Sequence, residues 1–259
     1  MTKALILAAG QGSRLRPITN EKPKCLVTLN GITLLQRQAD TLKAAGITEI
    51  HVATGYRADQ IEKLGFETSF NRDFDKTNMV ESLFCALGFL KNCREDLIIG
   101  YGDIIYERNN LETVLSDDSE VSLMIDTNWR DLWDVRSEDP LTDAETLVLD
   151  SNGFVKELGK KPKDYRKIDG QYTGLIKVRR DKLSDLIELY ESLDRDRYYD
   201  NQSFENMYMT SLLQLLIEAG WKVKAVQVHG GWLEVDTVDD LKIYETLLSS
   251  GELTRFISL

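Results

Sequence analysis

The sequence has few residues of the kinds that usually build disulfide frameworks or histidine-based metal sites. Its 259 residues include three cysteines and two histidines. Cys25, Cys85 and Cys93 are odd in number and lack Cys-x-x-Cys spacing, which argues against a disulfide framework or a zinc site. His51 and His229 stand far apart in the sequence, so a histidine-based metal site is not expected either.

Long apolar runs and an excess of positive charge are also missing. The apolar stretch at residues 4–9 is ended by Gly10 and followed by Arg14 and Arg16, which does not fit a signal peptide. No segment reaches the ~20 apolar residues of a membrane span. The formal net charge is -11, and an acidic surface repels nucleic acid and anionic membranes. We therefore expect a soluble, cytoplasmic protein with no nucleic-acid partner and no membrane insertion.

The first half of the chain alternates between two kinds of apolar pattern. Short continuous apolar runs indicate buried strands, and apolar residues at helical spacing indicate helices. The expected strands are residues 4–9, 49–54, 97–100 and 121–126, and the expected helices are residues 34–45, 58–64 and 78–90. This alternation predicts an α/β fold with a doubly wound, mostly parallel sheet.

The second half is more mixed. Residues 146–157 are predicted to form two strands around an Asn-Gly turn. The other expected strands are 172–178 and 222–228, and the expected helices are 182–193, 203–219 and 237–248, the last with Thr237 as its N-cap. We expect one domain over residues 1–259. A small β-rich insertion is expected to cover a cleft of this domain.

A loop rich in glycine and basic residues follows the first expected strand. Ligands of open α/β sheets bind beyond the carboxyl ends of the strands. Gly10 and Gly12 let the backbone approach a ligand and present N–H groups to phosphate, while Arg14 adds a planar fork of donors and Lys24 a second cation. The loop lacks the Gly-Lys-Ser/Thr of a Walker A motif, and Leu15 replaces the third glycine of a dinucleotide fingerprint. A phosphate cradle and a plain surface loop both remain open from these residues alone.

Three carboxylates follow other strands. Asp103 comes shortly after the strand at 97–100, and Glu234 and Asp236 follow the strand at 222–228. In an extended chain Glu234 and Asp236 share one face. Mg²⁺ is typically held by a few carboxylates together with substrate phosphates, so we predict Mg²⁺ as cofactor with these three residues as ligands. The alternatives are a turn residue for Asp103 and helix capping for Asp236.

Residues 7–26 have the pattern L-A-A-G-x-G-x-R-L-x-P-x-T-x-x-x-P-K-x-L. This segment resembles the signature of the nucleotidyltransferases that make NDP-sugars and CDP-alcohols. The similarity continues in order through Gly55-Tyr56, Tyr101-Gly102-Asp103, Lys160 and residues 232–237, and so covers nearly the whole chain. It implies a Rossmann-like fold of the nucleotide-diphospho-sugar transferase type.

The resemblance implies that residues 1–126 bind a nucleotide and that residues 127–259 bind an acceptor and complete a metal site. It also implies roles for individual residues. Arg14 would bind the triphosphate and stabilise its charge, and Lys24 would bind the acceptor phosphate or the α-phosphate. Asp103 and Asp236 would bind Mg²⁺. The implied nucleotide-binding residues are Leu7, Ala8, Ala9, Gly10, Gly12, Gly55, Asn78, Ser82, Tyr101 and Gly102.

Residues 71–83 resemble the N…TNxxxSL stretch of the phosphocholine cytidylyltransferase-like branch of these enzymes. In that branch Asn78 and Ser82 would lie near the base and the ribose. The two residues are one helical turn apart and face the same side. The alternative is that Asn78 caps a helix and Ser82 is a solvated serine.

The segment from Asp126 to Arg136, Glu145, and residues 172–175 also resemble that branch. The implied acceptor-binding residues are Trp129, Trp133, Arg136, Glu145, Lys160, Tyr172 and Trp232. The four aromatic rings in this set could form a box for a quaternary ammonium, helped by the charge of Asp131, Asp134 or Glu145. Aromatic residues at these spacings also occur as core packing, and a primary ammonium would use the same carboxylates with fewer rings.

The predicted reaction is the transfer of CMP from CTP to a small phosphorylated or phosphonate acceptor, with release of pyrophosphate. Phosphocholine-like compounds, aminoethylphosphonate and phospho-amino acids are the acceptors considered, and modification of a cell-surface polysaccharide would be the setting. One alternative is a sugar-1-phosphate nucleotidyltransferase that uses UTP, dTTP or GTP. Another is a nucleotide-binding regulatory subunit, which would be expected to have lost the anchors Arg14, Lys24, Asp103 and Asp236. The partners are then small-molecule substrates, and a homodimer is left open.

Overall fold

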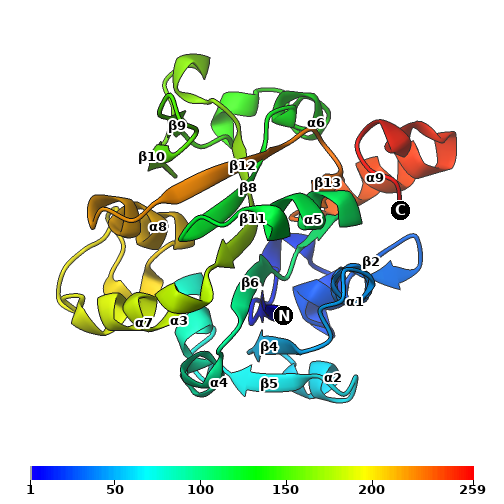
Figure 1. The fold of residues 1–259 in the computed structure, drawn as a ribbon. Helices are drawn as coiled ribbons and strands as arrows, with labels where there is room; N and C mark the ends of the chain where they lie inside the picture. Colours follow the sequence, from blue (N-terminus) through cyan, green and yellow to red (C-terminus); the bar gives the residue numbers. More distant parts are fainter. Residues whose placement is uncertain (1) are drawn as a thin grey trace.

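The computed structural model describes residues 2–259 and is built around one seven-stranded sheet (Figure 1). The strands lie in the order β12 (Val223–Val228), β8 (Val121–Asp126), β11 (Gln171–Val178), β6 (Asp96–Tyr101), β1 (Thr2–Ala8), β4 (Ile50–Thr54) and β5 (Glu67–Phe70). All neighbours are parallel except β11, which is antiparallel to both β6 and β8. The prediction of an α/β fold with a mostly parallel sheet is confirmed.

The pairing of β11 joins the two halves of the chain. This strand belongs to the second half, yet it lies between β6 and β8 of the first half. The central strands are buried on both faces, as the residues of β1 after Lys3 and all six residues of β8 show. Burial on both faces explains why these strands have continuous apolar sequences instead of an alternating pattern.

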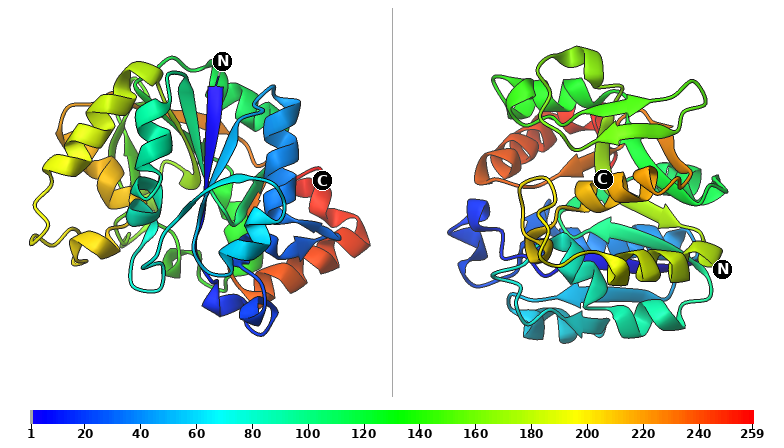
Figure 2. Two further views of the ribbon diagram at one scale, coloured as in Figure 1. Left: turned by 90° about the horizontal axis from the view of Figure 1, so that it is seen from below. Right: turned by 90° about the vertical axis from the view of Figure 1, so that its left-hand side faces the viewer.

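Helices cover both faces of the sheet (Figure 2). One apolar core contains side chains from α1 (Leu34–Ala44), α2 (Ala58–Glu62), α5 (Arg108–Ser116), α6 (Trp129–Arg136) and α9 (Val238–Ser250). The second core contains side chains from α3 (Met79–Phe84), α4 (Leu87–Asn92), α7 (Leu183–Ser192) and α8 (Met209–Glu218). None of the helices within residues 2–259 combines the length and the apolar character needed to cross a bilayer.

Three small two-stranded sheets complete the fold. They pair β9 (Leu147–Leu149) with β10 (Val155–Leu158), β7 (Ile104–Tyr106) with β13 (Trp232–Glu234), and β2 (Thr28–Leu29) with β3 (Ile32–Thr33). The β9–β10 hairpin turns at the predicted Asn-Gly sequence, where Asp150 Oδ1 accepts hydrogen bonds from the backbone N–H groups of Asn152 and Phe154.

Short 3-10 helices occupy several of the connections. They are η1 (Ser13–Leu15), η2 (Ile18–Asn20), η3 (Lys24–Leu26), η4 (Pro140–Thr142), η5 (Tyr165–Lys167), η6 (Arg180–Lys182), η7 (Phe204–Asn206) and η8 (Glu252–Arg255). The first three lie in the N-terminal loop between β1 and β2, which is therefore ordered by local turns along much of its length.

Two predicted helices differ from the structure. The expected helix at 78–90 is divided into α3 and α4, because Ala86 donates to Leu83 instead of continuing the regular ladder. The expected helix at 203–219 begins only at Met209, since the preceding segment turns through η7 and Glu205 accepts a backbone hydrogen bond from Asn78. The sequence analysis also missed β5, α5, α6 and the β7–β13 pair.

Candidate active site

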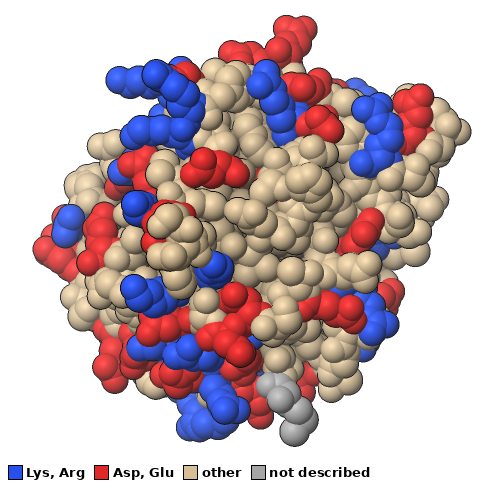
Figure 3. Space-filling model, turned by 45° about the horizontal axis from the view of Figure 1, so that its top comes forward, with Lys and Arg blue, Asp and Glu red and all other residues tan. Residues whose placement is uncertain are grey.

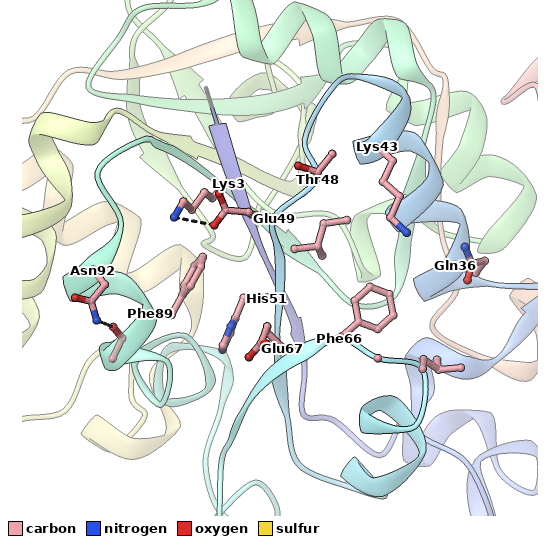
Figure 4. Close-up of a pocket in the computed structure, with 14 residues that line it drawn as sticks. Lys3, Gln36, Lys43, Thr48, Glu49, His51, Phe66, Glu67, Phe89 and Asn92 are labelled. Carbon is pink, nitrogen blue, oxygen red and sulfur yellow. Dashed lines mark hydrogen bonds and ion pairs between the residues drawn. The ribbon is translucent and has the colours of Figure 1, made fainter.

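Two large cavities lie at opposite ends of the parallel strands. One, of about 610 Å³, is lined by residues at the amino ends of β1, β4 and β5 (Figure 4). There the Nζ of Lys3 pairs with Glu49 at 2.8 Å, and the ring of His51 stacks on that of Phe89 at 4.5 Å. The other cavity, of about 560 Å³, lies beyond the carboxyl ends of β1, β6 and β12, and we call it the cleft. Its position is where open α/β sheets bind their ligands.

The N-terminal loop is held by a hydrogen bond within it and by another to the segment that follows β4. The carbonyl of Gly12 accepts a hydrogen bond of 2.7 Å from Thr19 Oγ1, and the carbonyl of Ala9 accepts one of 3.0 Å from Tyr56 N–H. Gly12 has φ +72°, and a Cβ there would lie 2.9 Å from both Cβ and Cγ of Lys24. The glycine is therefore needed both for its backbone conformation and to leave room for the lysine.

Replacing Gly12 with alanine is expected to displace the Lys24 side chain. We expect kcat/KM for pyrophosphate release to fall by roughly 10- to 100-fold, with a loss of about 1–3 kcal/mol in unfolding free energy from the strained backbone. Gly31→Ala is the matched control, because Gly31 has φ +73° but a Cβ there would meet nothing within 4 Å. Equal losses of activity in the two variants would show that the contact with Lys24 is unimportant.

Four charged side chains from distant parts of the sequence meet beside the cleft, which Arg14 and Asp236 line. Lys24 Nζ lies 2.6 Å from Asp103 Oδ2 and 2.6 Å from Asp236 Oδ1, and Arg14 pairs with the other oxygen of Asp236. Burial opposes the charged form of Lys24, but the two aspartates outweigh it and raise the pKa of Lys24 above its usual value. Four of the five residues predicted as catalytic groups and metal ligands are thus connected by ion pairs.

Glu234, the third predicted metal ligand, is oriented differently. Its carboxylate lies 3.2 Å from Arg136 NH2, and Arg136 also bonds to Asp240 at 2.9 Å. Burial raises the pKa of Glu234 although Arg136 lowers it. Among residues 2–259 no group of three His, Cys, Asp or Glu side chains is arranged to hold a metal ion, so the predicted set of three carboxylates is not assembled.

Arg136 itself was predicted to contact the acceptor, but it does not line the cleft. Its side chain is only 6% exposed and is held between Glu234 and Asp240. Asp240 also accepts hydrogen bonds from the backbone N–H groups of Asp236 and Thr237, and Thr237 caps α9 as predicted. Arg136 and Asp240 therefore position the segment that carries Asp236.

The predicted box of four aromatic rings is not formed. Trp133, Tyr172 and Trp232 line the cleft, whereas Trp129 is buried in the core with its ring 5.7 Å from that of Trp133. The guanidinium of Arg136 lies 5.1 Å from the centre of the Trp133 ring. Core packing, the alternative considered for these residues, accounts for Trp129.

Two residues predicted to lie near the base and ribose make hydrogen bonds within the protein. Asn78 caps α3 by accepting a hydrogen bond from the N–H of Met79, as its alternative interpretation proposed. Ser82 is 6% exposed and its hydroxyl accepts from Asn71 Nδ2 at 3.1 Å, so it is buried, not solvated. Neither residue lines the cleft, although Met79 does.

The remaining predicted nucleotide-binding residues lie at the end of β1 and next to it, and of these only Tyr101 lines the cleft. Leu7 and Ala8 end β1, and Gly102 N–H donates to the carbonyl of Leu7 at 2.9 Å. A Cβ at Gly102 would lie 2.7 Å from that carbonyl oxygen, and a Cβ at Gly55 would lie 2.7 Å from the carbonyl oxygen of Ala9. These glycines therefore let neighbouring segments pack against the end of β1.

The rim of the cleft carries positive charge even though the protein is acidic overall. Residues 160–167 contain five Lys or Arg side chains, and Lys160 and Lys161 line the cleft. Lys160 Nζ lies 3.2 Å from Glu157, with about half of its side chain exposed. Figure 3 shows Lys and Arg side chains gathered locally among Asp and Glu on the face that it displays. An anionic ligand would meet a local positive potential at this rim.

Two residues that hold the site together, Asp126 and Gln171, were not predicted from the sequence. Asp126 is 1% exposed and accepts hydrogen bonds from Asn128 N–H, Gly230 N–H and Trp232 Nε1–H, at 2.8, 2.9 and 2.8 Å. Gln171 is 4% exposed, lines the cleft and bonds to the backbone of Glu145. For Asp126 the signal was an acidic residue ending a continuous apolar strand, since a buried carboxylate requires donors around it.

Known proteins share both the sequence and the fold. Residues 4–120 match the MobA-like NTP transferase domain. The chain is 45% identical over 248 residues to the CTP:phosphoglutamine cytidylyltransferase of Campylobacter jejuni, covering 93% of this chain and 98% of that protein. It is 40% identical over 94 residues to the choline-phosphate cytidylyltransferase of Streptococcus pneumoniae, covering 35% of this chain and 41% of that protein.

Two solved structures have the same fold at 22% sequence identity. The CTP:phosphocholine cytidylyltransferase from Streptococcus pneumoniae has a TM-score of 0.71 and covers 95% of this chain and 99% of its own. The inositol-1-phosphate CTP transferase from T. maritima has a TM-score of 0.73 and covers 100% of this chain and 98% of its own. The resemblance stated from residues 7–26 is confirmed: this chain belongs to the nucleotidyltransferase family that includes the CTP:phosphoglutamine cytidylyltransferase of Campylobacter jejuni.

Proposed function

We propose that the protein transfers CMP from CTP to a small phosphorylated or phosphonate acceptor and releases pyrophosphate. The observation that carries the proposal is the contact of Lys24 with both Asp103 and Asp236, beside Arg14, at the carboxyl ends of the strands. The cytidylyltransferase relative that matches nearly the whole chain supports CTP as the donor. Because this relative is named a phosphoglutamine cytidylyltransferase, a phosphorylated amino acid is the acceptor that we consider first.

The chemistry requires positioning and charge stabilisation more than proton transfer. An acceptor oxygen, already anionic at neutral pH, attacks the α-phosphorus, a new P–O bond forms, and the bond to the β-phosphate breaks. Pyrophosphate leaves with the electron pair, so no general base is needed. Arg14, which lines the cleft with its side chain 65% exposed, would bind the triphosphate, while Lys24, paired with Asp103 and Asp236 next to the cleft, would offer a fixed charge.

Asp103 and Asp236 are the residues that would hold Mg²⁺ in this proposal. Asp103 Oδ1 is buried and has no hydrogen-bond partner within residues 2–259, which leaves its lone pairs free for a cation. Two carboxylates suit Mg²⁺, which takes few protein ligands and completes its shell with water and phosphate. Bound there, the ion would neutralise charge on the triphosphate.

A panel of substrates tests the proposed function. The purified protein is incubated with CTP, UTP, dTTP or GTP and with a phospho-amino acid, aminoethylphosphonate, phosphocholine or a sugar 1-phosphate, and pyrophosphate is measured. We expect release with CTP and with acceptors of the first three kinds. Release only with a sugar 1-phosphate and another triphosphate would establish the alternative enzyme, and no release with any pair would refute the proposal.

A further inference from the structure

Glu145 is held with its carboxylate in the cleft. Its neighbours Ala144 and Thr146 are 1% and 4% exposed, whereas the Glu145 side chain is open to the cleft that it lines. Gln171 fixes the Glu145 backbone from both sides, because its Oε1 accepts from Glu145 N–H at 3.0 Å and its Nε2 donates to the Glu145 carbonyl at 2.7 Å. The backbone of Glu145 is therefore held in place, and its side chain extends into the cleft.

The charge of Glu145 is not balanced by the protein. Asp236 is paired with Lys24 and Arg14, and Glu234 lies against Arg136. By contrast, the structure shows no ion pair and no side-chain hydrogen bond to the carboxylates of Asp143 or Glu145 within the described part of the chain, and both line the cleft.

An unpaired carboxylate is unfavourable in a cleft that receives phosphate groups. Although the Glu145 side chain is open to the cleft, the cleft walls partly desolvate its carboxylate, and together with the nearby charge of Asp143 they raise the pKa of Glu145 to about 6. Phosphate ligands would add further repulsion. A positive group on the ligand next to Glu145 would offset both the unfavourable surroundings of the carboxylate and its repulsion from phosphate.

The aromatic surroundings indicate which kind of positive group fits. A quaternary ammonium is recognised by open ring faces. Here Arg136 already lies over the Trp133 ring, Trp232 is 2% exposed, and Trp129 is outside the cleft. Of the tyrosines that line the cleft, Tyr101 and Tyr172 pack edge to face at 5.7 Å, which leaves Tyr208 as a single exposed ring and not a box. What the cleft offers instead is the carboxylate of Glu145. A carboxylate pairs best with an ammonium that donates N–H bonds.

We propose that Glu145 selects an acceptor that carries an N–H-bearing ammonium group, in preference to a quaternary or an uncharged head group. This inference rests on the proposed transfer of CMP and assigns to Glu145 the recognition of the acceptor. The cleft surface at Glu145 then belongs to the acceptor site, whereas Arg14, Lys24, Asp103 and Asp236 act on the phosphates.

The test compares paired acceptors. Phosphoethanolamine and propyl phosphate differ by NH₃⁺ against CH₃, and any phospho-amino acid that the panel finds active is paired with its analogue lacking the amino group. For the wild type we expect kcat/KM to favour the ammonium member by roughly 10- to 100-fold, the worth of one charge-assisted hydrogen bond, and to favour phosphoethanolamine over phosphocholine. In Glu145→Gln the ratio is expected to fall close to one, and Glu145→Asp should retain part of it.

Glu138→Gln is the matched control, because it makes the same chemical change at an exposed glutamate outside the cleft and should keep the wild-type ratio. Thermal unfolding of each variant checks the fold. An unchanged ratio in folded Glu145→Gln, or a wild-type preference for phosphocholine, would overturn the assignment of Glu145 while leaving CMP transfer intact. Absence of pyrophosphate with CTP and every acceptor would instead refute the proposed function.

The pH profile gives a second readout. Below about pH 6 Glu145 gains a proton and loses its attraction for the ammonium, so KM for the ammonium acceptor should rise as the pH falls. Asp143, Lys160, Lys161, Tyr101 and Tyr172 share the cleft, and burial raises the pKa of both tyrosines, which stay neutral over this range. The acceptor phosphate titrates in wild type and variant alike. The difference between wild type and Glu145→Gln should therefore disappear at low pH, and a constant difference would contradict the role of Glu145.

Discussion

Replacing Asp103 with asparagine is expected to lower kcat for pyrophosphate release by roughly 10³-fold with little effect on the fold. The substitution keeps the shape of the side chain but removes the charge that pairs with Lys24 at 2.6 Å and that would hold Mg²⁺. Loss of one preorganised electrostatic group at a reacting centre typically lowers kcat by about 10²–10³-fold, and weaker metal binding adds to this. Steady-state kinetics over a range of Mg²⁺ concentrations measures both effects.

Asp59→Asn provides the control, since Asp59 also pairs with a lysine, Lys63 at 2.8 Å, but on the exposed surface of α2. We expect this variant to keep wild-type kinetics because exposed pairs of this kind contribute little. EDTA is expected to abolish pyrophosphate release by the wild type, and added Mg²⁺ to restore it. Full activity in EDTA would refute the metal proposal, and full activity of Asp103→Asn would refute the role of Asp103.

Replacing Asp126 with alanine is expected to destabilise the protein by roughly 3–5 kcal/mol. The carboxylate is almost completely buried and accepts hydrogen bonds from Asn128, Gly230 and Trp232, all of which would lose their partner. Each buried donor left without an acceptor costs about 1–3 kcal/mol. For a chain of this size the midpoint of thermal unfolding should fall by roughly 10 °C.

Asp118→Ala is the corresponding control, because Asp118 is the same residue type just before the start of β8 but is exposed. Its unfolding midpoint should stay within about 1–2 °C of the wild type. The Asp126 variant should also lose activity at temperatures where it is still folded, since Asp126 fixes Trp232 at the start of the strand that leads to Asp236. An unchanged midpoint for Asp126→Ala would show that the buried donors find other partners.

Local sequence was sufficient for the parts of the protein whose structure depends on neighbours in the chain. The apolar run before Gly10 predicted β1, and the Asn-Gly turn predicted the β9–β10 hairpin. Thr237 was predicted to cap α9 because capping requires only the first turn of the helix. Arg14 and Lys24 were identified because they lie close to the first strand in a specific motif.

The sequence was less informative where burial depends on distant segments. Lys177 would be expected in water, yet it is 2% exposed and donates to the carbonyls of Leu115 and Asp117 at 2.9 and 2.7 Å. Arg136 was assigned to the acceptor, but the fold turns it toward Glu234. Both outcomes depend on partners far away in the chain, and no local pattern encodes them.

The sequence by itself determined the family, the type of sheet and the charged groups that would handle phosphate, because the strand-loop pattern and the motif at residues 7–26 are local. Only the tertiary structure decided which acidic residues share the cleft and which are neutralised. Glu138 and Glu145 are the same residue type only seven positions apart, yet only Glu145 lines the cleft. The physical reason is that the charge environment of a side chain depends on every segment packed around it, and these segments come together only when the chain folds.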